Sequence, residues 1–300
     1  MAALIASLRP HQWSKNLLVF AALGFSKHLF EPVPLLRALV AFAIFCALSG
    51  VVYLVNDIAD VERDRLHPRK RRRPIASGAL EVRTAGIAAA VLGSASLGAA
   101  LPLGWGFLTV AAAYLALNLA YSLRLKEIVI LDVLSVSLGF VLRAIAGGVA
   151  IGVPISDWLL VCTILLALFL ALAKRRHEIT SLGGDAAGHR PILKEYSPYL
   201  LDQMISVVTA SCVTAYTFYT LAPETRDKFQ TDRLSWTVPF VLYGIFRYLY
   251  LVHQKDGGGS PSESLVTDRP LLVAVALWAA ATVLILYTAT GAPIPLAVAR

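Results

Sequence analysis

Long apolar segments are the feature of this sequence that limits its possible folds most strongly. Of the 300 residues, 57% are hydrophobic and 15% are charged, whereas a soluble domain carries about 25% charged residues. A helix needs about 20 mainly apolar residues to cross a bilayer. Such segments recur at Leu17–Leu29, Leu35–Val55, Thr84–Leu101, Trp105–Tyr121, Ile128–Ile151, Trp158–Ala173, Leu200–Leu221, Trp236–Val252 and Leu271–Thr288. The sequence therefore predicts an all-α integral membrane protein with nine transmembrane helices, in a single domain over residues 1–300.

The positive charges are distributed unevenly between the predicted loops. The chain has 27 Lys and Arg residues against 19 Asp and Glu, a net charge of +8. If the amino terminus is cytoplasmic, most of these cations fall in cytoplasmic loops, as the positive-inside rule requires. We therefore expect a multi-pass protein of the cell membrane with a cytoplasmic amino terminus. Contact with anionic membrane lipid accounts for the basic excess, and without a base-stacking or groove-reading motif we expect no nucleic-acid partner.

A cluster of oxygen-bearing side chains directly continues the second apolar segment. If the helix continues, Asn56, Asp57, Asp60 and Asp64 project within an arc of about 100°. Like charges at these spacings destabilise a helix, so a cation should offset them. Mg²⁺ takes oxygen ligands and commonly bridges one or two carboxylates to substrate phosphates. We therefore predict a magnesium site at these four residues. The alternative is a solvated helix end whose acids pair with arginines, which suits Glu62, on the opposite face, best.

Three motifs resemble one known family. The NDxxDxxxD pattern over Asn56–Asp64 resembles the first aspartate-rich motif of the UbiA prenyltransferase superfamily. Lys70–Gly78 resembles the KRPxxxG run that follows it there, and Tyr121–Lys126 resembles the family's YSxxLK motif. The resemblance extends over nearly the whole chain. It implies a helical bundle with a central cavity capped by cytoplasmic loops, and magnesium-dependent cleavage of a diphosphate substrate at the cytoplasmic face.

One departure from that family pattern indicates a branch. Ordinary members carry a second aspartate cluster after the sixth helix, whereas this chain has Lys-Arg-Arg-His-Glu at residues 174–178. Cations suit phosphate oxygens better than a metal ion. This run, the RPxQWxKN pattern over Arg9–Asn16 and the segment Arg143–Gly148 resemble the decaprenyl-phosphate phosphoribosyltransferase branch. The resemblance implies transfer of 5-phosphoribose from phosphoribosyl pyrophosphate to a polyprenyl phosphate, with release of pyrophosphate.

The resemblance and the chemistry together give a set of candidate residues. Catalytic roles are expected for Asp57, Asp60 and Lys126. Substrate-binding roles are expected for Lys15, Asn16, Tyr53, Lys70, Arg73, Tyr121, Lys126, Asp132, Arg143, Lys174, Arg175 and Glu178. Two points stay open here. Asp132 either orients ribose or supports the metal site, or it pairs with Arg143, which lies on the same helix face about 16 Å away. Lys15 either reaches the cavity or anchors the first helix at the membrane surface.

Two other functions fit parts of the sequence. One is a UbiA-type transferase that moves a polyprenyl group from its diphosphate to an aromatic acceptor, and the basic run at residues 174–176 argues against it. The other is a transporter or a noncatalytic scaffold. Transporters usually place polar sites near the bilayer midplane on broken helices, whereas the carboxylates of this chain lie at one predicted interface.

Overall fold

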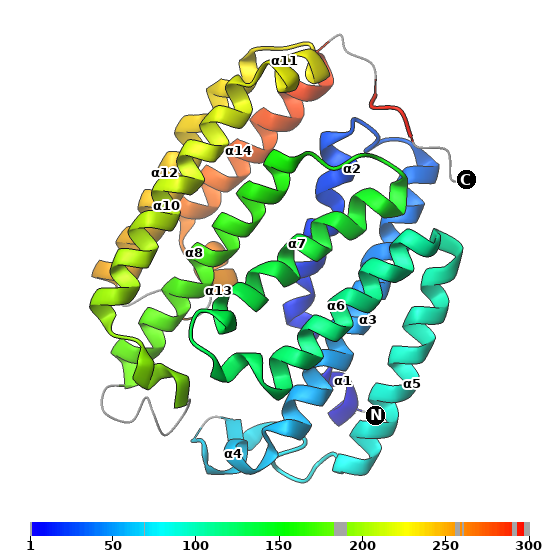
Figure 1. The fold of residues 1–300 in the computed structure, drawn as a ribbon, viewed down its shortest axis with the longest axis vertical. Helices are drawn as coiled ribbons and strands as arrows, with labels where there is room; N and C mark the ends of the chain where they lie inside the picture. Colours follow the sequence, from blue (N-terminus) through cyan, green and yellow to red (C-terminus); the bar gives the residue numbers. More distant parts are fainter. Residues whose placement is uncertain are drawn as a thin grey trace. The chain divides into compact units, whose positions relative to one another are not determined.

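Helices account for every regular element in the described part of the chain (Figure 1). The computed structural model describes residues 2–68, 70–182, 191–255, 259, 261–289 and 293–296. The chain divides into two compact units. Unit 1 comprises Met1–Leu23, Phe30–Pro154 and Leu296–Arg300, and unit 2 comprises Gly24–Leu29 and Ile155–Pro295. The predicted all-α class is confirmed.

Unit 1 is built around its longest helix. Its long helices are α3 (Pro32–Ala59), α5 (Val82–Ala100), α6 (Trp105–Leu123) and α7 (Leu131–Ile151). Its short helical segments, with η denoting 3-10 helix, are α1 (Ala2–Ser7), η1 (Pro10–Phe20), α4 (Val61–Leu66), η2 (Lys70–Arg72), η3 (Leu101–Leu103) and η4 (Leu125–Glu127). Helix α3 packs against α5, α6 and α7. The aromatic rings of Phe45, Phe107 and Tyr114 lie at the centre of this core.

The first apolar segment does not form one continuous helix. Segment η1 is followed by the short helix α2 (Ala21–Phe25). Segment η1 packs against both α3 and α7, and the approach to α7 is very close: a Cβ atom added to Gly147 would lie 1.9 Å from the carbonyl oxygen of Val19. Glycine is therefore required at this crossing, because any side chain would collide with the backbone of η1.

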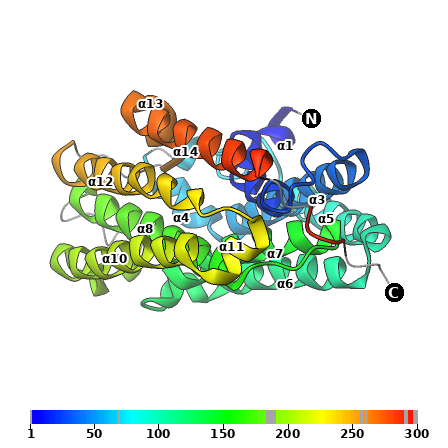
Figure 2. The ribbon, with the colours of Figure 1, turned by 90° about the horizontal axis from the view of Figure 1, so that it is seen from above.

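Unit 2 is a row of four long helices with short connecting segments. The long helices are α8 (Asp157–Leu182), α10 (Pro198–Leu221), α12 (Val238–Gln254) and α14 (Arg269–Thr288). The short segments are η6 (Pro191–Glu195), α11 (Pro223–Phe229), η7 (Arg233–Thr237) and α13 (Pro261–Thr267). Helix α8 packs against α10, α10 against α12, and α12 against α14 (Figures 1 and 2).

Side-chain caps fix where two of these helices begin. The side chain of Ser197 accepts a hydrogen bond from the backbone N–H of Leu200 at the start of α10. Asp268 accepts one from Leu271 at the start of α14. Each cap satisfies a backbone donor that the helix itself leaves without a partner.

Seven helices in the described ranges are long and apolar enough to cross a membrane: α3, α5 with η3, α6, α7, α8, α10 and α14. Helix α12, predicted as a span, has 17 residues, and the predicted first span is divided between η1 and α2. The protein is thus a multi-pass membrane protein, and the predicted count of nine spans is not confirmed.

Candidate active site at the end of helix α3

The aspartate cluster lies where α3 gives way to α4. Helix α3 ends at Ala59, and Asp60 leaves helical geometry with φ −100° and ψ 8°. The backbone nevertheless keeps the helical hydrogen-bond spacing, because the N–H of Asp60 donates to Asn56 and the N–H of Asp64 donates to Asp60. The chain therefore continues in nearly the same direction. Asp57 and Asp64 remain on one side and are 2% and 3% exposed.

A single arginine joins the two buried aspartates. Nη1 of Arg73, just after η2, lies 3.1 Å from Oδ1 of Asp57 and 2.6 Å from Oδ2 of Asp64. Arginine suits this role because it stays charged and because Nη1 carries two N–H donors, one for each carboxylate. The arrangement offsets the repulsion expected between the two acids.

Arg9 makes a second contact to Asp57 from the start of the chain. Its Nη2 lies 2.5 Å from Oδ1 of Asp57, and its guanidinium lies 4.9 Å from the ring centre of Tyr53. The backbone of Arg9 has φ 51°, in the left-handed region that non-glycine residues rarely adopt. Strain of this kind persists where the surrounding contacts hold the residue in place. Sequence reasoning had not selected Arg9 as a site residue.

Lys126 reaches the third aspartate from the connection between α6 and α7. Its Nζ lies 2.7 Å from Oδ1 of Asp60. The connection turns sharply, since η4 is followed by Ile130 with φ 68°. A β-branched residue at positive φ is a strained outlier. The turn leads directly to Asp132, which is fully buried at the start of α7.

Glu62 and its neighbours behave as a solvated helix surface. Glu62 pairs with Arg65 at 2.8 Å, and Arg63 pairs with Glu127 at 3.0 Å. All four side chains are 46% exposed or more, so these pairs add little to stability. The helix angles predicted that Glu62 projects away from the three aspartates. Its exposed pairing with Arg65 agrees with that prediction.

The donor set of the cluster suits a metal ion shared with a substrate. No group of three acidic, His or Cys side chains in the described part of the chain lies close enough to enclose a metal ion. Each aspartate, however, uses only one carboxylate oxygen in its contacts with cations in the described residues. The other oxygen of each of Asp57, Asp60 and Asp64 contacts no cation among the described residues, and Asn56 is half-buried on the same turns of helix. Mg²⁺ usually takes only one or two carboxylates and completes its shell with water and phosphate oxygens.

A buried network around Arg143 lies deeper in unit 1. Arg143 Nε donates to Oδ1 of Asn16 at 2.7 Å, Nη2 to the hydroxyl of Tyr114 at 2.7 Å, and Nη1 to the carbonyl of Gly139 at 2.8 Å. Ser49 adds a hydrogen bond to the same oxygen of Asn16. Arg143 is 7% exposed, and its guanidinium donates to neutral acceptors. The structure therefore does not support the alternative in which Arg143 pairs with Asp132.

The remaining candidates of unit 1 lie on the same elements. Lys15 is half-buried on η1, Tyr121 is half-buried on the last turn of α6, and Lys70 is half-buried at the start of η2. On α3, Ser49, Tyr53 and Asp57 recur every fourth residue and so share one face. This spacing is the signal that could have identified Ser49 from the sequence.

Three candidates lie in unit 2, on the last turns of α8. Lys174 is exposed, whereas Arg175 is 4% exposed and donates to Glu178 at 2.7 Å. Arg175 and Glu178 are three positions apart, so they are neighbours on the helix surface. The pair keeps a buried cation at this end of the helix.

Comparisons with known proteins agree on one family. Residues 17–264 match the model of the UbiA prenyltransferase family. A decaprenyl-phosphate phosphoribosyltransferase of Corynebacterium glutamicum is 36% identical over 95% of this chain and 86% of that protein. The protein of that name from Mycolicibacterium smegmatis is 35% identical over 93% of this chain and 90% of its own length. A UbiA homolog from Archaeoglobus fulgidus, solved with DMAPP and Mg²⁺, has a TM-score of 0.71 and 19% identity, covering 95% of this chain and 99% of that one. At 19% identity, the likeness to the Archaeoglobus fulgidus structure shows the fold alone.

Proposed function

The chain belongs to the UbiA prenyltransferase family, and from that membership we propose that it transfers 5-phosphoribose from phosphoribosyl pyrophosphate to a polyprenyl phosphate such as decaprenyl phosphate. In this reaction the bond between the ribose anomeric carbon and pyrophosphate breaks, and a bond from that carbon to a lipid phosphate oxygen forms. Relatives that carry this activity in their names share about a third of their residues with the chain over nearly its whole length.

The observation that carries the proposal is the alternation of acids and cations at the end of α3. Asp57 and Asp64 share Arg73, and Asp60 holds Lys126. A diphosphate bound with a divalent cation presents the complementary pattern, since its oxygens attract the basic groups while its cation attracts the carboxylates. The ligand-free contacts keep each buried charge paired, and binding would exchange each partner for a group of the substrate.

Magnesium held by Asn56, Asp57, Asp60 and Asp64 would neutralise the charge that develops on departing pyrophosphate. Arg9, Arg73 and Lys126 would hold the diphosphate oxygens by charge-assisted hydrogen bonds. The acceptor phosphate is already an anion, so its attack on the anomeric carbon needs no general base.

The basic end of α8 supports phosphoribose rather than a prenyl group as the transferred unit. Lys174 and Arg175 are followed by a single carboxylate, Glu178, which is tied to Arg175. Where the family pattern has a second cluster of metal-binding aspartates, this chain has cations, which suit phosphate oxygens. We assign Lys174, Arg175 and Glu178 to phosphate binding, with Lys15, Tyr53, Lys70, Tyr121 and Asp132 as further substrate contacts.

We also propose that the protein lies in the cell membrane with the aspartate cluster on the cytoplasmic side. Arg63, Arg65, Arg71 and Arg72, around α4 and η2, are exposed. Exposed cations beside a membrane span favour the cytoplasmic side and contact with anionic lipid headgroups.

The test is a reconstituted reaction with defined substrates. Purified protein, Mg²⁺, phosphoribosyl pyrophosphate carrying a labelled ribose and decaprenyl phosphate should release pyrophosphate and move the label into an organic extract. Asp57→Asn should remove this activity, and Glu62→Gln, which changes an exposed acid one turn away, should retain it. Turnover of a polyprenyl diphosphate with an aromatic acceptor, and none with phosphoribosyl pyrophosphate, would instead support the other UbiA-type reaction.

A further inference from the structure

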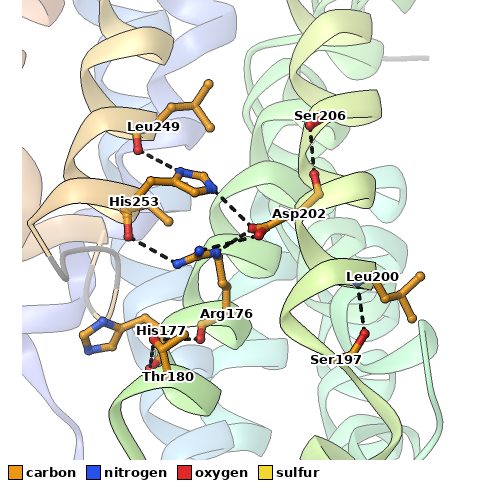
Figure 3. Close-up of polar contacts among 10 residues, drawn as sticks. Arg176, His177, Thr180, Ser197, Leu200, Asp202, Ser206, Leu249 and His253 are labelled. Carbon is orange, nitrogen blue, oxygen red and sulfur yellow. Dashed lines mark hydrogen bonds and ion pairs between the residues drawn. The ribbon is translucent and has the colours of Figure 1, made fainter.

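Asp202 joins three helices of unit 2 at one end of the bundle. From α8, Nε of Arg176 lies 2.5 Å from Oδ1 of Asp202, which belongs to α10. From α12, Nε2 of His253 lies 3.2 Å from the same oxygen. Arg176 also donates through Nη1 to the carbonyl of Val252. Figure 3 shows the side chains of Arg176 and His253 converging on Asp202 from the two neighbouring helices.

His253 lies between two acceptors. Its Nδ1 lies 2.9 Å from the backbone carbonyl of Leu249, and its Nε2 faces the carboxylate of Asp202. A carbonyl and a carboxylate only accept hydrogen bonds. Each ring nitrogen of His253 therefore faces an acceptor, one on its own helix and one on α10. The cluster is a carboxylate shared by an arginine and a histidine.

Arg176 lies among the residues of α8 that the proposed function assigns to phosphate binding. Successive helical residues are rotated by about 100°. Fixing the side chain of Arg176 against α10 and α12 therefore fixes the direction in which Arg175 and Lys174 project. Because Arg175 is 4% exposed and pairs with Glu178, a small rotation of this end would displace both of them.

We propose that Asp202 and His253 are positioning residues, which hold Arg176 and so set the rotation of the α8 end that carries Lys174, Arg175 and Glu178. The proposal rests on the function proposed above for those three residues. Asp202 and His253 act through Arg176 and do not themselves touch the substrate.

The contacts of Asp202 with Arg176 and His253 are called the clamp below. Hydrogen exchange of the intact protein in detergent tests the clamp without any substrate. In Asp202→Asn and in the milder His253→Gln, amides of residues 174–182 should exchange about tenfold faster than in the wild type. Asp268→Asn is the matched control, since it removes the acid of the Arg247–Asp268 ion pair at 2.8 Å between α12 and α14. Unchanged exchange in both clamp variants, or an equal increase in the control, would overturn the proposal.

Kinetics then connect the clamp to the proposed reaction. The substrate whose KM rises in Arg175→Gln should also show a raised KM in Asp202→Asn, by about tenfold, with a smaller change in kcat. His253→Gln should raise the same KM, by less than Asp202→Asn does. An unaltered KM in both variants would contradict the positioning role. If the wild type turned over no phosphoribosyl pyrophosphate, the proposed function would fail while hydrogen exchange still decided the clamp.

Discussion

Lys126 and Asp60 are 66 positions apart in the sequence, and their side chains meet at 2.7 Å between Nζ and Oδ1. Both are partly buried, with 12% and 20% of the side chains exposed. The contact ties the connection before α7 to the break between α3 and α4. It brings a cation to the acid that follows the end of α3.

Lys126→Met should lower turnover about 100-fold, because the negative charge that develops on the departing diphosphate would then lack the hydrogen bond from the Lys126 ammonium group. Lys126→Arg should retain part of the activity. Lys194→Met, at an exposed position on η6, serves as the control and should behave as wild type. Steady-state release of pyrophosphate measures all three. Full activity in Lys126→Met would remove this residue from the catalytic assignment.

Chelation of divalent cations should abolish turnover, and added Mg²⁺ should restore it. A readout independent of activity is thermal stability, since a ligand that binds only the folded state raises Tm. Mg²⁺ with pyrophosphate should raise the Tm of the wild type and of Glu62→Gln, but not that of Asp57→Asn. An equal rise in Asp57→Asn would show that the cation binds elsewhere.

Gly147→Ala should destabilise unit 1, because the added Cβ would lie 1.9 Å from the carbonyl oxygen of Val19. Overpacking of this kind costs about 1–3 kcal/mol, and Tm should fall by several degrees. Gly86→Ala is the matched control on α5, where a Cβ meets nothing within 4 Å. It should be neutral or stabilising, because alanine favours helix more than glycine does.

Arg143→Lys should destabilise the protein by about 2–4 kcal/mol, since an ammonium cannot serve the three fixed acceptors of the guanidinium and leaves buried groups without a donor. Arg124→Lys makes the same chemical change at an exposed position at the end of α6 and should leave Tm unchanged. Thermal unfolding in detergent compares the two. Equal Tm values would mean that the Arg143 network contributes little to stability.

Asp268 gives a stability effect that depends on pH. Hydrogen bonds from the Arg247 side chain lower the pKa of Asp268 below its usual value of 3.8. A carboxyl whose folded pKa is lowered stabilises the fold above its unfolded pKa, and this contribution is lost as the pH falls through the folded value. The Tm difference between the wild type and Asp268→Asn should therefore be largest near neutral pH and shrink below about pH 4. A constant difference would contradict the assignment.

The motifs of the sequence identified the family, and the matches to the family model and to the phosphoribosyltransferases confirm the resemblance. The spacing of Asp57 and Asp64 also placed these two acids on one side of the helix, and both contact Arg73. The assignment of these residues to metal and substrate remains a prediction, which the experiments above address. Contacts such as Arg9 to Asp57, 48 positions apart, could not be read from spacing, because helix periodicity describes only neighbours within one element.

The sequence by itself determined that the chain is helical and crosses a membrane, because in a hydrocarbon layer a long apolar segment satisfies its backbone only as a helix or in a closed barrel. The tertiary structure alone decided which charges meet. Arg73 between Asp57 and Asp64, Lys126 on Asp60, and Arg176 with His253 on Asp202 all depend on which helices are neighbours. It also showed that the first apolar segment divides between η1 and α2 and that η1 crosses α7 closely at Gly147, a contact that depends on packing between distant parts of the chain.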